Sequence, residues 1–135
     1  MYIDPSLRVL VVDPTEEVSP ILTQMLGQIG IKEVETVPGP VEGLTRLREK
    51  KIDIVITDWQ GEPMNGAEFI RTVRADATLF ETRFLVVTAD VEPAQVVEAY
   101  RAGADGYAIV PFSTKALATK LTQIRDALAE LPLPA

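Results

Sequence analysis

Two aspartates, Asp13 and Asp58, are the residues of this sequence best placed to do chemistry, because each directly follows a run rich in Val and Ile, at 7–12 and 52–57. Such runs are typical of strands buried on both faces of a parallel sheet, where ligands bind beyond the carboxyl ends of the strands. Two carboxylates that meet there repel each other unless a cation or a proton intervenes, so the pair predicts a hard divalent metal or a raised pKa. Taken singly, either aspartate also suits an ordinary turn, and that alternative stays open.

The remaining composition narrows the chemistry further. The chain has 135 residues with no Cys and no His, which removes thiolate and Ser-His nucleophiles, imidazole bases, disulfides and nearly every zinc site. Thirteen basic residues against twenty acidic ones leave a net charge of -7, so we expect no nucleic-acid binding by this domain and no membrane association. The apolar runs span about half a bilayer and the N-terminus lacks a signal sequence, so we expect a cytoplasmic protein.

The elements that would position these aspartates alternate regularly along the chain. Short Val- and Ile-rich or alternating runs predict strands at 7–12, 33–37, 52–57, 83–88 and 106–110. Apolar residues spaced three or four apart predict amphipathic helices within 18–29, 41–47, 69–73, 96–100 and 117–128. Each crossover is long enough for a helix, so right-handed βαβ units and a parallel sheet follow. We predict one α/β domain over 1–135 with its core in 7–128, and an end at 131–135 that is either frayed or the stub of a linker.

Individual residues mark the ends of several predicted helices. Gly30 and Gly103 fall just past two of them, where a left-handed cap suits glycine. Ser113 or Thr114 could cap the start of the last helix. Pro20 requires the first helix either to begin late or to be kinked.

Four blocks, LRVLVVD, IDIVITDWQGEPMNG, FLVVTAD and AGADGYAIVPF, follow one another in this order. Together they resemble the CheY-like receiver domain of response regulators, over Leu7 to about Leu128. The resemblance implies a (βα)5 doubly wound sheet of five parallel strands in the flavodoxin-like order 2-1-3-4-5. It also implies two-component phosphorelay signalling.

The same resemblance implies roles for five residues. Asp58 matches the aspartate that accepts a phosphoryl group from a sensor histidine kinase or a phosphotransfer protein. Asp13 matches the first of two acidic residues that hold Mg²⁺, and Asp58 and the carbonyl of Gln60 match further ligands. Thr88 matches the hydroxyl residue that contacts the phosphoryl group, and Tyr107 the aromatic switch that reorients with it. The chain is then a signalling receiver and not an enzyme, beyond self-phosphorylation and dephosphorylation on Asp58.

Three departures from the family pattern concern this site. Pro14 stands where the family has its second acidic residue, and Val110 replaces the lysine that pairs with the acceptor aspartate. Pro63 lies five residues after Asp58 where four is usual, which puts Gln60 in doubt as a ligand. Phosphoryl transfer relies on positioning and on charge stabilisation, and losing one such contact commonly costs about a hundredfold or more in rate. We therefore expect a weak or lost Mg²⁺ site.

These departures favour an atypical receiver, with weak or absent phosphorylation of Asp58, that acts through protein–protein interaction. A conventional Mg²⁺-dependent switch on Asp58 is the alternative. Glu16 or Glu17 could supply a replacement carboxylate, although acidic residues there also suit the start of a helix. A metal-dependent hydrolase on the same fold is a remote third hypothesis, because there is no P-loop or second carboxylate suited to it.

The face built from the fourth predicted helix, the last predicted strand and the last predicted helix provides a candidate partner surface. Period-two alternation places Tyr107 and Ile109 on one face and Ala108 and Val110 on the other. Val110 matches a position that faces the site in the family, so we expect Tyr107 and Ile109 to face outward and to bind a target protein or a second copy of the chain. The resemblance also implies a cis peptide bond between Val110 and Pro111.

Overall fold

The computed structural model describes residues 6–89 and 92–129, so the predicted linker-like end at 131–135 lies outside the described residues. The strands are β1 (Arg8–Val12), β2 (Glu33–Val37), β3 (Ile54–Asp58), β4 (Arg83–Thr88) and β5 (Gly106–Ile109). The helices are α1 (Ser19–Ile29), α2 (Pro40–Glu49), α3 (Gly66–Arg74), α4 (Pro93–Ala102) and α5 (Thr114–Ala129). All strands pair in parallel in the order β2-β1-β3-β4-β5, which confirms the predicted α/β topology.

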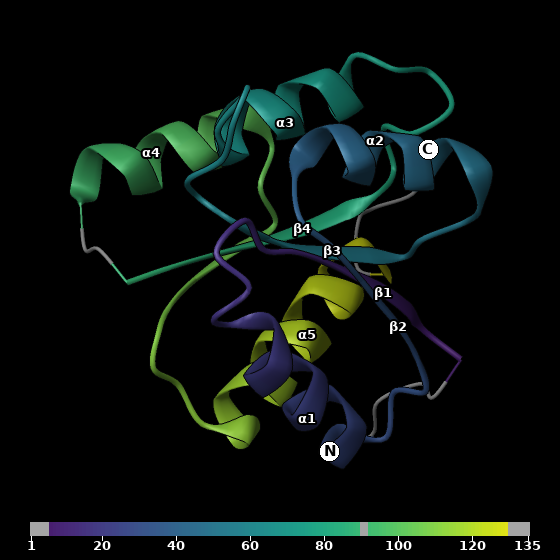
Figure 1. The fold of residues 1–135 in the computed structure, drawn as a ribbon, viewed down its shortest axis with the longest axis vertical. Helices are drawn as coiled ribbons and strands as arrows, with labels where there is room; N and C mark the ends of the chain where they lie inside the picture. Colours follow the sequence, from purple (N-terminus) through teal and green to yellow (C-terminus); the bar gives the residue numbers. More distant parts are fainter. Residues whose placement is uncertain (1–5, 90–91, 130–135) are drawn as a thin grey trace.

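Helices cover both faces of the sheet, which explains why its central strands are apolar without alternation. Figure 1 shows α1 and α5 against one face and α2, α3 and α4 against the other. Side chains of β1 alternate between the two layers: Leu10 and Val12 pack toward Phe69 of α3, and Val9 and Val11 pack with the α1 and α5 layer. None of the helices in the described part of the chain is long and apolar enough to cross a membrane.

The predicted helix signals are found in the structure. Gly30 and Gly103 adopt left-handed conformations, with φ of 107° and 114°, just after α1 and α4. The Ser113 hydroxyl oxygen accepts a hydrogen bond from the Ala116 N–H at 3.0 Å, so Ser113 caps α5. Helix α1 begins at Ser19, which places Pro20 in its first turn. Backbone N–H groups there have no partner within the helix, so the missing N–H of proline costs no helical hydrogen bond.

The parallel sheet has two chemically different edges. At its carboxyl edge the strands end and helices begin, so unpaired helical N–H groups gather there. At its amino edge the strands begin and helices end, so carbonyl oxygens gather there instead. Val12 of β1 lies opposite Thr57 of β3, so Asp13, the residue after β1, and Asp58, the last residue of β3, occupy equivalent positions on adjacent strands.

Candidate functional site

Most of the predicted site residues come together at the carboxyl edge. Asp13, Asp58 and Thr88 lie at the ends of β1, β3 and β4, which are neighbours in the sheet. Asp58 is partly exposed, and its Oδ1 accepts a hydrogen bond from the backbone N–H of Gln60 at 2.9 Å. Thr88 is buried opposite Ile109 of β5. The arrangement gathers two carboxylates and a hydroxyl at one edge of the sheet.

Asp13 is buried, with 2% of its surface exposed, and its carboxylate organises the chain that follows it. Oδ2 accepts from the backbone N–H groups of Val18 at 3.0 Å and Ser19 at 2.7 Å. Oδ1 accepts from the hydroxyl of Thr15 at 2.9 Å and from its N–H at 3.3 Å. Val18 occupies the N-cap position of α1 and its side chain has no acceptor, so Asp13 supplies the cap from upstream.

The hydrogen bonds to Asp13 also control its ionisation. Burial acts to raise the pKa of this carboxyl, but bonds from the Ser19 backbone, the Thr15 side chain and the Val18 backbone together hold the pKa below its ordinary value. Asp13 is therefore a carboxylate at neutral pH.

Tyr107 is a correction to the sequence prediction. It was expected to face outward, yet only 7% of it is exposed, and it belongs to the apolar layer that contains Ala99 and Ala102 of α4. The alternation itself is confirmed, because Ala108 and Val110 pack on the opposite face of the sheet. The exposure was wrong because α4 covers the part of β5 that carries Tyr107.

Comparison with known proteins identifies the family. The family model described as the response regulator receiver domain matches residues 9–122. The chain belongs to this family. The match begins within β1, includes β2 to β5 and covers the site at the carboxyl edge.

Individual relatives agree with this assignment. Chemotaxis protein CheY-3 of Vibrio cholerae is 29% identical over 126 residues, covering 93% of this chain and 97% of the relative. Chemotaxis protein CheY of Pseudomonas aeruginosa is 30% identical over 118 residues, covering 87% and 95%. The solved structure of the chemotaxis response regulator CheY4 of Vibrio cholerae superposes with a TM-score of 0.80 at 28% identity, covering 88% of this chain and 98% of that one.

In this receiver domain the residues present do not fit the Mg²⁺ ligand set that the family implies. Each oxygen of Asp13 already accepts two hydrogen bonds from the loop and helix that follow. Pro14 has no carboxylate to replace the second acidic residue. Within residues 6–89 and 92–125, no three acidic side chains cluster so as to hold a metal, so neither Glu16 nor Glu17 completes such a group. Mg²⁺ demands near-octahedral oxygen coordination, which this set does not offer.

Val110 changes the other side of the receiver site. Its backbone N–H donates to the Thr88 carbonyl at 2.9 Å, and its partly buried side chain packs with the layer between the sheet and α1 and α5. Where the family has an ammonium group, this domain has an apolar contact. The peptide bond from Val110 to Pro111 is cis, as the resemblance implied.

The loop after Asp58 is held by contacts that the sequence analysis missed. Asn65 and Glu68 form a capping box: the Asn65 side chain accepts from the Glu68 N–H at 2.9 Å, and the Glu68 carboxylate accepts from the Asn65 N–H at 3.0 Å. The Gly66 N–H donates to the Trp59 carbonyl at 2.6 Å, and a side chain at Gly66 would approach the Asp58 carbonyl within 2.9 Å. The asparagine with glutamate three residues later was the available signal.

Proposed function

We propose that this receiver domain is an atypical member of its family, in which Asp58 is phosphorylated weakly or not at all and which signals through protein–protein contacts. A sensor histidine kinase or phosphotransfer protein remains its upstream partner class in a two-component system. The observation that carries the proposal is the state of Asp13, whose carboxylate is committed to capping α1.

Two substitutions add to this argument. Pro14 removes an acidic ligand, and Val110 removes the cation that would stabilise charge on the phosphoryl oxygens. Each loss of a preorganised charge contact commonly costs about a hundredfold or more in rate. The loss of both the acidic ligand and the cation would make phosphoryl transfer inefficient in a domain that keeps the receiver fold and Asp58.

Phosphorylation by acetyl phosphate tests the proposal directly. We expect little or no phosphoryl adduct by mass spectrometry in millimolar Mg²⁺, and no saturable change in the fluorescence of Trp59, which lies buried beside Asp58. The double variant Pro14→Asp with Val110→Lys should bind Mg²⁺ and label at least tenfold more. Asp58→Asn in the same background is the matched control and should abolish the label.

A conventional switch on Asp58 is the second candidate, and the retained positions of Asp58, Thr88 and Tyr107 favour it. A stable adduct on the unmodified protein that Asp58→Asn removes would establish this alternative and contradict the proposal. A folded double variant that gains neither metal nor label would assign the obstacle to features it keeps, namely the committed carboxylate of Asp13 and the loop that carries Pro63.

The proposed partner surface is formed by α4 and β5. Because Tyr107 is buried, it is left out of this surface, and Ile109 is kept. Val97 and Tyr100, one turn apart on α4, are 48% and 47% exposed, and Ile109 on β5 is 40% exposed. Exposed apolar groups gathered on neighbouring elements mark interaction sites more often than scattered ones do. We propose that a target protein or a second copy of the chain binds there.

Charge insertion tests this surface. Ile109→Glu combined with Val97→Glu should abolish self-association in analytical ultracentrifugation or capture of the target in a pull-down. Ile21→Glu is the matched control for Ile109→Glu alone, because Ile21 is 54% exposed but lies on α1 at the other face of the sheet. If the paired variant associates like the unmodified protein in both assays, the surface is not the interface.

A further inference from the structure

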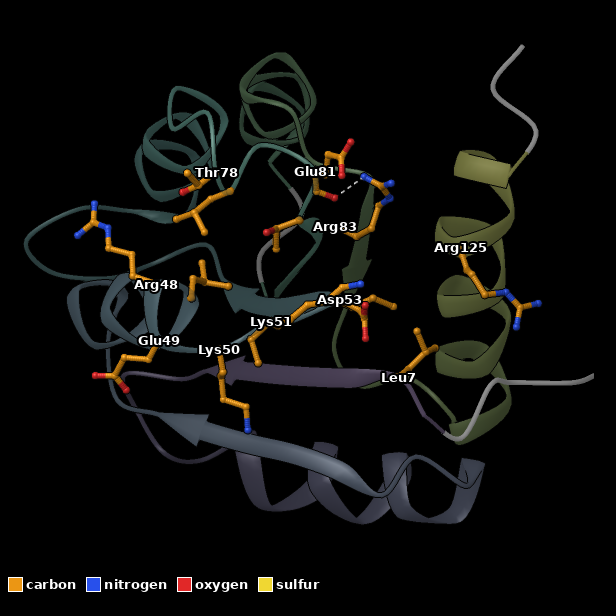
Figure 2. A pocket seen from close by; sticks show the side chains of 15 residues that line it. Leu7, Arg48, Glu49, Lys50, Lys51, Asp53, Thr78, Glu81, Arg83 and Arg125 are labelled. Atoms are coloured by element: carbon orange, nitrogen blue, oxygen red, sulfur yellow. Dashed lines mark hydrogen bonds between the residues drawn. The ribbon is translucent and has the colours of Figure 1, made fainter. Parts of the chain in front are cut away.

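A cavity of about 640 Å³ opens at the amino edge of the sheet, the edge opposite Asp58. It lies between the end of α2, the segments that lead into β1, β3 and β4, and α5, as Figure 2 shows. Its volume is within the range of small-molecule sites, roughly 300–1,000 Å³. None of the residues with a role in phosphoryl transfer lines it, so the proposed function leaves it unexplained.

The lining of this cavity combines apolar and basic side chains. Its apolar residues are Leu7, Leu47, Ile52, Ile54 and Leu79, the last four of them buried. Its basic residues are Arg48, Lys50, Lys51, Arg83 and Arg125. Five basic residues against the acidic Glu49, Asp53 and Glu81 reverse the balance of the whole chain, which has 13 basic and 20 acidic residues.

Some of the basic residues are explained by the fold. Arg48 and Lys50 lie at the end of α2, where cations are favoured by the helix carbonyls, and they pair with Asp76 at 4.0 Å and Glu35 at 3.4 Å. These two charges are balanced by partners outside the lining, as is that of Glu49 by Arg46 at 3.0 Å, so Lys51 and Arg83 are the cations that matter for a ligand.

Lys51 and Arg83 are not explained in that way. Lys51 lies before β3 and Arg83 is the first residue of β4. Among the described residues neither forms a salt bridge. Within the part of the chain that the structure describes, the Arg83 guanidinium donates one hydrogen bond, to the Glu81 carbonyl at 2.6 Å, which leaves other guanidinium donors for a ligand. The cavity acid nearest the sheet, Asp53, already accepts from the Arg8 backbone N–H at 2.8 Å.

We infer that this cavity binds a small amphipathic anion, with an apolar or aromatic body against the leucine and isoleucine side chains and a phosphate or carboxylate group against Lys51 and Arg83. The planar guanidinium of Arg83 suits both kinds of oxyanion. Such a ligand would be an input to the domain that does not depend on Asp58.

Two fluorescent probes that differ in charge test the site. 8-Anilinonaphthalene-1-sulfonate is aromatic and anionic, and N-phenyl-1-naphthylamine has the same rings without the sulfonate. In the folded protein we expect saturable binding of the anionic probe, weakened as salt is raised. Lys51→Gln with Arg83→Gln should weaken it at least tenfold and leave the affinity for the neutral probe unchanged.

The matched control is Arg101→Gln with Lys115→Gln, which removes one Arg and one Lys outside the cavity and changes the net charge equally. This control should leave the affinities for both probes unchanged. Asp58→Asn should also leave them unchanged, so a failure of this ligand site can be distinguished from a failure of the proposed function. Competition by 1-naphthyl phosphate and 1-naphthoate then shows which oxyanion is preferred.

Three results would overturn the inference. The first is no saturable binding of the anionic probe, and the second is equal weakening by the control variant, which would reduce the effect to net charge. The third is amide chemical-shift changes on titration that avoid Lys51, Thr78 and Arg83. Circular dichroism on each variant confirms that the fold is kept.

Discussion

At the carboxyl edge of the sheet a buried anion, Asp13, is surrounded by N–H donors, whereas at the amino edge a half-buried cation, Arg74, is surrounded by oxygen acceptors. The polarity of the fold accounts for the Asp13 cluster, because α1 begins at the first edge, and for the Gly103 acceptor of Arg74, because α4 ends at the second. Each edge satisfies its excess of unpaired backbone groups with a side chain of opposite character.

The Arg74 cluster joins parts of the chain that are distant in sequence. The guanidinium donates to the carbonyl oxygens of Phe80, Thr82 and Gly103, the last at 2.8 Å, and to the carboxylate of Asp105 at 3.0 Å. It also lies 5.3 Å above the ring of Phe84. Burial lowers the pKa of Arg74, and Asp105 offsets part of that effect.

The two clusters differ in reach. The partners of Asp13 lie two to six residues away, so it shapes one loop and one helix start. The partners of Arg74 lie six to thirty-one residues away, so it connects α3 to the segments before β4 and β5. Removing the local cluster should therefore destabilise one segment, whereas removing the long-range cluster should lower the free energy of unfolding of the whole domain.

The largest effect is therefore expected from Arg74→Met. Removing the guanidinium leaves part-buried carbonyls and the Asp105 carboxylate without their donor, and we expect a loss of about 3 kcal/mol in the free energy of unfolding by urea denaturation. Arg71→Met is the matched control on the same helix, because its ion pair with Glu98 is largely exposed and should contribute less than about 1 kcal/mol. Equal losses in the two variants would remove the distinction between the clusters.

A smaller loss, about 1–2 kcal/mol, is expected from Asp13→Asn. The amide keeps one acceptor oxygen but turns an NH₂ group toward N–H donors of the loop or of α1. Glu17→Gln, an exposed change in the same loop, is the control and should be nearly neutral. Faster amide hydrogen exchange confined to the first turn of α1 would show that the effect is local, and exchange that rises across the sheet would contradict the comparison.

The contribution of Asp13 should also depend on pH. Its pKa is lowered in the folded state, so the stability it adds is complete above the ordinary pKa of about 3.9 and is lost as pH falls through the lower, folded value. The difference in unfolding free energy between the unmodified protein and Asp13→Asn should be constant from about pH 7 to 5 and should shrink in more acid solution. A difference that grows on acidification would show that Asp13 is not the ionised cap described.

The two clusters also differ in how well the sequence predicts them, because their partners lie at different distances along the chain. Strand positions, the order of the sheet and the caps at Gly30 and Gly103 were predictable, because they depend on local periodicity or on ordered blocks of the family. The meeting of Asp13 and Asp58 at one edge followed from the topology. Arg74 was not predictable, because its acceptors are backbone carbonyls that any sequence supplies and only the folded chain brings together.

The exposure of a side chain and the direction in which a carboxylate points could not be predicted from the sequence either. Alternation in β5 gave the correct faces, but only the position of α4 shows that Tyr107 is covered and Ile109 is not. Similarly, an aspartate after a strand was compatible with a metal ligand or with a turn. Its hydrogen bonds to Thr15, Val18 and Ser19 favour the structural role.

The smallest effect, and the finest test of the long-range cluster, comes from two glycines that differ in their surroundings. Gly30 and Gly103 both have positive φ, so alanine at either should cost about 1 kcal/mol in backbone strain. A Cβ at Gly30 meets nothing within 4 Å, whereas one at Gly103 would lie 2.8 Å from Nε of Arg74. Gly103→Ala should therefore destabilise by about 1 kcal/mol more than Gly30→Ala. In the Arg74→Met background that extra loss should diminish, because the shorter, flexible side chain can move away. If the two alanine variants are equally stable, or if the excess at Gly103 persists without Arg74, the guanidinium is not what constrains the turn after α4.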